Sequence, residues 1–247
     1  MKIIVVESGS KGNATLIYDE GRLLLIDMGI TLTSLKQGLA RIDKKLLDID
    51  ALLLTHSHTD HTKGVQYLDP LPIYCTKGSY SGSNVNYIEP FQKFMVEHFM
   101  ITPIAASHDA PNTVGFVIKN KKEKLVYLTD TGMIPDKSLS KMKNADYYII
   151  ESNHNIKMLH QTHRPASLKL RILSDEGHLN NETSAIYMSE LVGDKTKEII
   201  LAHLSEEANA PEVALKAYKK IFQKCRIDLS KINLHCASQR EIVEGGK

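Results

Sequence analysis

The stretch Thr55-His56-Ser57-His58-Thr59-Asp60-His61 carries more chemical information than any other part of this sequence. It follows residues 49–55, a Leu- and Ile-rich segment that we predict to be a buried strand. In extended chain His56 and His58 point to the same side, and a following turn can bring Asp60 and His61 beside them. Imidazole and carboxylate groups bind Zn, Mn or Fe, and four of them exceed what one ion takes from so short a segment. We therefore predict two metal ions here; the alternative is a polar helix start capped by Asp60.

The composition of the chain indicates what kind of protein carries this site. The 247 residues include 31 Lys+Arg and 29 Asp+Glu, a net charge of +2, so any contact with nucleic acid must be local. The contents of 42% hydrophobic and 24% charged residues are those of a globular protein. Three cysteines are too few for a disulfide framework, and the N-terminal residues do not form a signal peptide. We expect a soluble, cytoplasmic protein without membrane contact.

The hydrophobic pattern predicts many short strands mixed with helices. We predict strands at residues 3–6, 14–18, 23–27, 49–55, 73–76, 99–106, 114–119, 125–130, 147–151, 199–203 and 232–235, and helices at 31–39, 62–68, 138–142, 182–192 and 211–224. Residues 152–181 form the least regular stretch, and Ile186, Met188 and Leu191 are the expected inward positions of the helix that follows. No linker divides the chain. We expect one α+β domain over residues 1–247, with two mixed sheets and helices on the outside.

The pattern H-x-H-x-D-H after an apolar strand resembles that of the metallo-β-lactamase superfamily. Four further positions of that pattern follow in order: Asp27 after an early strand, His108 before a strand, Asp130 after a strand, and His203 in Ala-His-Leu. The resemblance implies an αββα sandwich with metal ions at one edge, between the two sheets. Taken singly, each later match reads as a polar residue at the end of a strand; their order and placement favour the metal site.

The resemblance also implies a ligand set for two divalent ions. His56, His58 and His108 would hold one ion, and Asp60, His61 and His203 the other, with Asp130 bridging them. Asp27 would lie behind the ligands and fix one imidazole. Zn, Mn and Fe suit this set equally. Two divalent cations with two carboxylates leave a net positive charge, which favours an anionic phosphate over a neutral amide as substrate.

Two residues outside the ligand set indicate phosphodiester chemistry. In the phosphodiesterase and tRNA-processing branches of the superfamily, a Glu at a strand end pairs with a later His that protonates the leaving oxygen. Glu151 and His178 are similar in place and order, and an alkoxide leaving group needs such an acid. We expect Asp60, Glu151 and His178 to be the catalytic residues. The alternative makes Glu151 an ordinary strand-end acid and His178 a loop residue.

Several blocks are similar to one group within the superfamily, the YycJ/WalJ (VicX) group. The blocks are Ser8-Gly9-Ser10-Lys11-Gly12-Asn13, Ser107-His108-Asp109-Ala110-Pro111-Asn112-Thr113-Val114-Gly115-Phe116, Glu151-Ser152-Asn153-His154 and Ser174-Asp175-Glu176-Gly177-His178-Leu179. The resemblance implies a 5′ to 3′ DNA exonuclease encoded beside a two-component system that controls cell-wall metabolism. The sequence departs from the group at Met28, at Asn155 and at residues 160–164, which leaves the metal set intact.

Substrate contacts can be expected at a few more polar residues. The candidates are Ser10, Asn13, Asn112, His154 and Arg171, although turn roles and an exposed helix face explain several of them equally well. Trp is absent and aromatic residues are 6%, so we expect contacts with the DNA backbone rather than base stacking. Two other functions stay open: a small-molecule metallohydrolase acting on thioesters, lactones or cyclic phosphates, and a regulatory accessory protein of a two-component signalling system. The sequence leaves the oligomeric state unknown.

Overall fold

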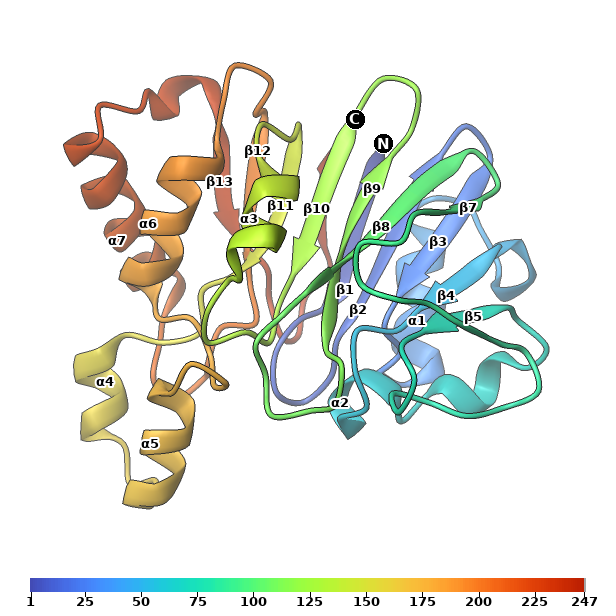
Figure 1. The fold of residues 1–247 in the computed structure, drawn as a ribbon, viewed down its shortest axis with the longest axis horizontal. Helices are drawn as coiled ribbons and strands as arrows, with labels where there is room; N and C mark the ends of the chain where they lie inside the picture. Colours follow the sequence, from blue (N-terminus) through green and yellow to red (C-terminus); the bar gives the residue numbers. More distant parts are fainter. Residues whose placement is uncertain (247) are drawn as a thin grey trace.

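The computed structural model describes residues 1–246, whose strands form two seven-stranded sheets packed face to face (Figure 1). The first sheet contains, in spatial order, β14 (Val243–Gly246), β1 (Lys2–Glu7), β2 (Ala14–Asp19), β3 (Arg22–Ile26), β4 (Ala51–Leu53), β5 (Ile73–Cys75) and β6 (Val85–Tyr87). The second contains β13 (Asn233–Cys236), β12 (Glu198–Ala202), β11 (Tyr147–Glu151), β10 (Lys124–Leu128), β9 (Val114–Lys119), β8 (Phe99–Ala105) and β7 (Phe94–Val96).

The two sheets repeat one pairing pattern. In the first sheet, β14-β1-β2-β3 pair in antiparallel fashion and β3-β4-β5-β6 in parallel. In the second, β7-β8-β9-β10 are antiparallel and β10-β11-β12-β13 are parallel. Strand β3 therefore corresponds to β10, and β4 to β11. Because parallel strands share a direction, the carboxyl ends within each parallel set lie at one edge of the sheet, and there the polar segments begin.

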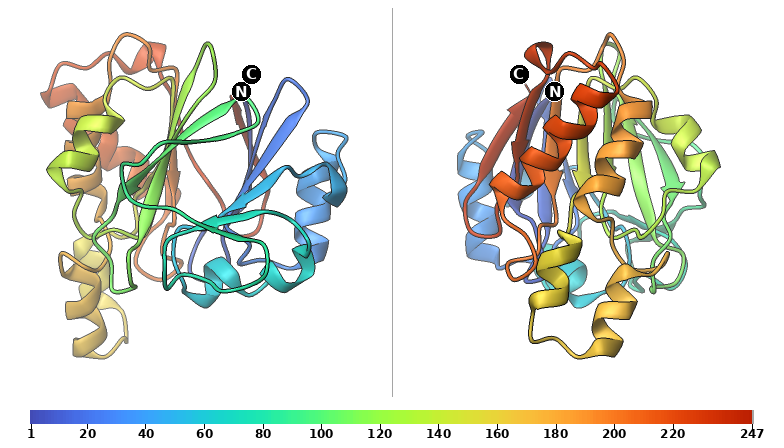
Figure 2. Two further views of the ribbon diagram at one scale, coloured as in Figure 1. Left: turned by 45° about the vertical axis from the view of Figure 1, so that its right-hand side comes forward. Right: turned by 90° about the vertical axis from the view of Figure 1, so that its left-hand side faces the viewer.

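Helices cover the outer faces of both sheets (Figure 2). The α-helices of the described residues are α1 (Leu32–Ala40), α2 (Thr59–Thr62), α3 (Asp136–Met142), α4 (Ile156–Gln161), α5 (Ala166–Leu173), α6 (Asn181–Leu191) and α7 (Pro211–Lys224), with short 3-10 helices at Leu46–Asp48, Val65–Leu68 and Leu229–Lys231. One apolar core fills the space between the sheets, and two others lie under the outer helices. This is the predicted αββα sandwich. None of the helices in the described part of the chain is long and apolar enough to cross a membrane.

Several local predictions were wrong. Residues 152–181 contain helices α4 and α5, which project beyond the sandwich (Figure 1). Pro165 lies directly before α5, where a proline is tolerated because the first N–H groups of a helix have no partner within the helix. The predicted helix at 62–68 is two short pieces, and the predicted strand at 49–55 pairs only over Ala51–Leu53.

The predicted inward face of α6 was also partly wrong. Met188 and Leu191 are buried, but Ile186 is 48% exposed. The buried positions of this helix are Asn181, Ser184, Ala185, Met188 and Leu191, a spacing of three to four residues that Ile186 does not share. Strands β6, β7 and β14 were not predicted, because they are only three to four residues long.

Candidate metal centre

Three turns at strand ends direct polar side chains toward one edge of the sandwich. Asp27 follows β3, Asp130 follows β10 and His203 follows β12, and all three have a left-handed backbone, with φ of 58°, 56° and 56°. Such a conformation costs a non-glycine residue about 1–3 kcal/mol and clusters at functional sites. Asp27 and Asp130 lie after corresponding strands of the two sheets, so the repeated pattern reproduces the same turn in each half.

The predicted ligand residues come together in the groups that the sequence suggested. Candidate ligand atoms of His56, His58 and His108 lie within 4.8 Å of one another, and so do those of Asp60, His61 and His203.

Asp130 lies between these two groups. Its Oδ2 atom is 3.2 Å from Nε2 of His61, and its Oδ1 atom is 4.0 Å from Nε2 of His108. It also belongs to a compact group with His56 and His61. One carboxylate therefore faces both clusters.

Four of the candidate ligand residues each have one buried polar atom that makes no hydrogen bond within residues 1–246. Nε2 of His56, Nε2 of His108, Nε2 of His203 and Oδ2 of Asp130 are buried and have no hydrogen-bond partner among the described residues. Burial of polar atoms without partners is costly, so four of them at one point indicate a missing partner. All four are donors of electron pairs to a cation. The residues present therefore fit divalent metal ions.

The opposite ring nitrogens of the imidazoles are held by neighbouring groups. Nδ1 of His61 donates to Asp27 Oδ2 at 2.8 Å, and the Thr55 hydroxyl donates to Asp27 while lying 3.0 Å from Nδ1 of His56. Nδ1 of His108 donates to the carbonyl of Gly177 at 3.2 Å. Each contact fixes a ring with its Nε2 atom toward the cluster, as in known metal sites. The contact of Asp27 with an imidazole is the one that the sequence predicted.

The electrostatics of the cluster favour a bound cation. Burial lowers the pKa of His56 and of His108, which keeps these imidazoles in the neutral, metal-binding form. Burial would also lower the pKa of His203, but Asp130 and Glu151 outweigh it and raise the value to about 9. Burial likewise opposes the charge of Asp130, yet His203 and His61 hold its pKa well below the usual range. The Asp130 carboxylate is thus charged and lies beside positively charged imidazoles. Bound metal ions can supply that positive charge in place of the imidazole protons.

Glu151 and His178 also meet beside the cluster. Nδ1 of His178 donates to Oε1 of Glu151 at 2.8 Å, and the His178 side chain is 17% exposed whereas that of Glu151 is fully buried. The other carboxylate oxygen accepts from the backbone N–H groups of Thr131 and Leu179. Burial opposes ionisation of Glu151, but the His178 imidazole and a further hydrogen bond from His203 lower its pKa to about 2. A charged, immobile carboxylate therefore holds a partly exposed imidazole at the site.

The expected substrate residues occupy different surroundings. Asn13 is fully buried, and its amide lies 3.0 Å from Nε2 of His61 and from the carbonyl of Gly9, beneath the cluster. Asn112 donates to the backbone of Lys77, and Ser10 is exposed. His154 is buried beside Asn153, and its Nε2 atom has no partner among the described residues. Arg171 is exposed at the end of α5 and pairs with Asp109.

Sequence reasoning overlooked three residues that contact the cluster, namely Thr55, Asp109 and Gly177. Thr55 and Asp109 each adjoin a predicted ligand in the sequence, so position next to His56 or His108 was the available signal. Gly177 acts through its backbone carbonyl, which no sequence pattern reveals.

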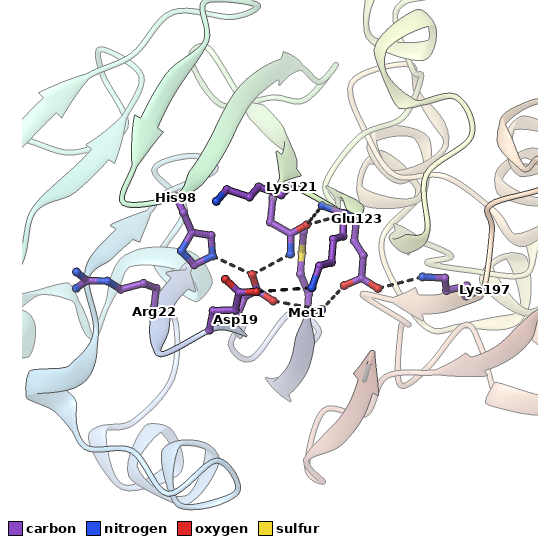
Figure 3. Close-up of a pocket in the computed structure, with 10 residues that line it drawn as sticks. Met1, Asp19, Arg22, His98, Lys121, Glu123 and Lys197 are labelled. Atoms are coloured by element: carbon purple, nitrogen blue, oxygen red, sulfur yellow. Dashed lines mark hydrogen bonds and ion pairs between the residues drawn. The ribbon is translucent and has the colours of Figure 1, made fainter.

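A hollow of about 470 Å³ lies at the opposite edge of the sandwich, between the β2–β3 and β9–β10 turns (Figure 3). Its charged groups satisfy one another. Asp19 accepts from His98 and from Asn120 at 2.8 Å each, and Glu123 accepts from Lys197 at 3.0 Å. Because no buried polar atom of these residues lacks a partner, this hollow has the character of a link between the sheets rather than of a metal site.

An αββα sandwich with a His/Asp cluster at one edge is the arrangement of the metallo-β-lactamase superfamily, and comparison with known proteins places the chain there. The sequence profile described as "Beta-lactamase superfamily domain" matches residues 22–203, and the chain belongs to that superfamily. The crystal structure of the metallo-beta-lactamase fold protein YhfI from Bacillus subtilis superposes with a TM-score of 0.73 at 21% identity, covering 99% of each chain. The superfamily fold and the His/Asp clusters together imply divalent metal binding.

Two curated relatives narrow the membership to the YycJ/WalJ group. Exodeoxyribonuclease YycJ of Bacillus anthracis is 32% identical over 232 residues, which cover 89% of this chain and 88% of that protein. Exodeoxyribonuclease WalJ of Streptococcus pneumoniae is 35% identical over 228 residues, which cover 86% of this chain and 85% of that protein. The resemblance seen in the sequence motifs is thereby confirmed over most of the chain.

Proposed function

We propose that this protein is a dinuclear, metal-dependent phosphodiester hydrolase that degrades DNA from the 5′ end. The observation that carries the proposal is the Glu151–His178 pair, with 2.8 Å between Oε1 and Nδ1, beside a cluster of buried ligand atoms without partners. The name exodeoxyribonuclease, which both curated relatives bear, supports DNA as the substrate class. We further propose that the enzyme acts in the cytoplasm as a single domain.

In this proposal the seven ligand residues divide as their contacts suggest. His56, His58 and His108 would hold one ion and Asp60, His61 and His203 the second, and Asp130 would serve both because it lies between the two groups. When bound, two divalent ions would supply a water nucleophile active at neutral pH and stabilise negative charge on the phosphate oxygens. Asp27 and Thr55 fix the imidazoles of His61 and His56 in the required orientation.

The remaining chemistry belongs to His178. Its Nδ1 proton is held by Glu151, which leaves Nε2 as the ring atom that can carry a proton to the leaving oxygen. Glu151 is the orienting group because its own oxygens are saturated by backbone and imidazole donors. An acid at this position suits an alkoxide leaving group, which a nucleotide presents and an activated ester does not.

The experiment that tests this function is a substrate panel. Purified protein loaded with Mn or Zn is incubated with 5′- and 3′-labelled DNA, with RNA, with bis(p-nitrophenyl) phosphate and with a thioester. We expect stepwise release of nucleotides from the 5′ end of DNA, and elemental analysis should find two metal ions per chain. Hydrolysis of the thioester alone would replace the proposal with a small-molecule hydrolase, and a fully loaded protein with one ion would remove the bridging role of Asp130.

A further inference from the structure

The end of helix α5 is attached to the loop that carries the candidate ligand His108. Nε of Arg171 donates to Oδ2 of Asp109, and the carbonyl of Gly177 accepts from Nδ1 of His108 at 3.2 Å. The chain between these contacts folds back on the helix, because the N–H of His178 donates to the carbonyl of Ile172 at 3.0 Å. Arg171, His108 and the candidate acid His178 therefore belong to one compact unit.

Glycine at position 177 makes this compactness possible. A Cβ atom there would lie 2.2 Å from the carbonyl oxygen of Arg171 and 2.4 Å from that of Ile172. Both neighbours are backbone atoms, which cannot move aside as a flexible side chain can. The turn that presents His178 thus fixes where Arg171 stands relative to the cluster.

Asp109 lies between Arg171 and the metal-binding residues. Its Oδ1 atom is 3.3 Å from Nε2 of His108 and 3.7 Å from Nε2 of His58, while its Oδ2 atom accepts from Arg171. The Arg171 side chain is 51% exposed, and no described residue accepts a hydrogen bond from its terminal amino groups. A guanidinium held by Nε still offers those groups as a fork that matches two phosphate oxygens.

We propose that Arg171 binds the backbone phosphate next to the one being cleaved, and that Asp109 is a positioning residue that holds its guanidinium there. This inference rests on the proposed nuclease function. The Asp109 carboxylate lies between Arg171 and the imidazoles of His58 and His108. When one phosphate of a strand is bound at the cluster, the guanidinium is therefore placed to bind the next phosphate. The pair would thereby make the enzyme prefer a polynucleotide over an isolated diester.

The test compares a single-stranded oligodeoxynucleotide with bis(p-nitrophenyl) phosphate, which has no neighbouring phosphate. Arg171→Ala should raise KM for the oligonucleotide about tenfold, a usual loss for a charge-assisted contact, with much smaller changes in kcat and in KM for the small ester. The slope of log KM against log salt should also become shallower by about 0.7, the value for one phosphate contact on a single strand. Arg41→Ala removes the same charge at the end of α1, far from the cluster, and should leave that slope unchanged.

Asp109→Asn tests the positioning role separately. Metal content should stay at the wild-type value, KM for the oligonucleotide should rise, and the double variant Asp109→Asn/Arg171→Ala should be no worse than Arg171→Ala alone. Loss of metal in Asp109→Asn would overturn the positioning role and make Asp109 a ligand. Equal losses on both substrates in Arg171→Ala would reduce the pair to a structural support. If the wild type hydrolyses only the small ester, the nuclease proposal fails; if it cleaves DNA and Arg171→Ala matches it, only this inference fails.

Discussion

Oε1 of Glu151 accepts a hydrogen bond from Nδ1 of His203 at 2.9 Å, and it is the same oxygen that accepts from His178. Sequence patterns had paired Glu151 with His178 alone. The structure adds a contact to a candidate metal ligand, so this one carboxylate orients both an imidazole that would bind a metal and an imidazole that would transfer a proton. Variants at Glu151 and His178 should therefore differ in what they lose.

Glu151→Gln should weaken metal retention as well as turnover. An amide must direct an N–H group either at the two imidazole donors or at the backbone donors of Thr131 and Leu179, so at least one donor loses its acceptor. Loss of an outer hydrogen-bond partner costs about 10–100-fold in metal affinity. Titration with a fluorescent chelator measures that affinity, and an unchanged value would limit Glu151 to orienting His178.

His178→Ala should keep its metal ions but lose activity in a way that depends on the leaving group. Removal of a general acid costs about 10²–10⁴-fold in turnover of DNA. The loss should be much smaller for bis(p-nitrophenyl) phosphate, because p-nitrophenolate leaves without a proton. Steady-state kinetics on both substrates decide the matter. Equal losses would show that His178 supports the loop rather than the chemistry.

Gly29→Ala should displace the metal-binding segment from its support. A Cβ atom at position 29 would lie 1.5 Å from the carbonyl oxygen of Asp60, a backbone atom of the ligand segment. We expect a loss of about 1–3 kcal/mol in unfolding free energy, typical of overpacking, together with weaker metal binding. Gly82→Ala is the control, because its nearest neighbour is the ring of Tyr80 at 3.3 Å. Urea unfolding and metal titration of both variants make the comparison; similar behaviour of the two would contradict the prediction.

His154 should make the metal-free protein less stable on acidification. Burial lowers its pKa from 6.5 to about 4. Between those values the unfolded chain binds the proton and the folded chain does not, so the unfolding free energy falls as the pH drops from about 6.5 to about 4. The full difference corresponds to about 3 kcal/mol. Urea unfolding of chelator-treated wild type and His154→Gln over this range should show a smaller decline for the variant, and parallel curves would exclude this contribution.

The sequence by itself determined the fold class and the candidate ligands. The ends of β3, β10 and β12 could be located to within two residues because apolar runs stop abruptly at Asp27, Asp130 and His203, and the turn chemistry there is local. Helix α7 was predicted with its bounds Pro211–Lys224, because its start on proline and its amphipathic spacing are also local signals. Helices α4 and α5 were overlooked because their four or so exposed turns carry little apolar periodicity.

What only the tertiary structure decided is which side chains share a hydrogen-bond partner. Glu151 contacts His203 across 52 positions of sequence, and His108 contacts Gly177 across 69. Such contacts depend on the packing of two sheets and on left-handed turns at Asp130 and His203, neither of which a local pattern specifies. The pairing of Arg171 with Asp109 has the same origin, since a helix that projects from one sheet is brought against a loop between strands by the fold alone. The sequence names the groups that can bind a metal, and the packing of the sheets determines how each of them is oriented.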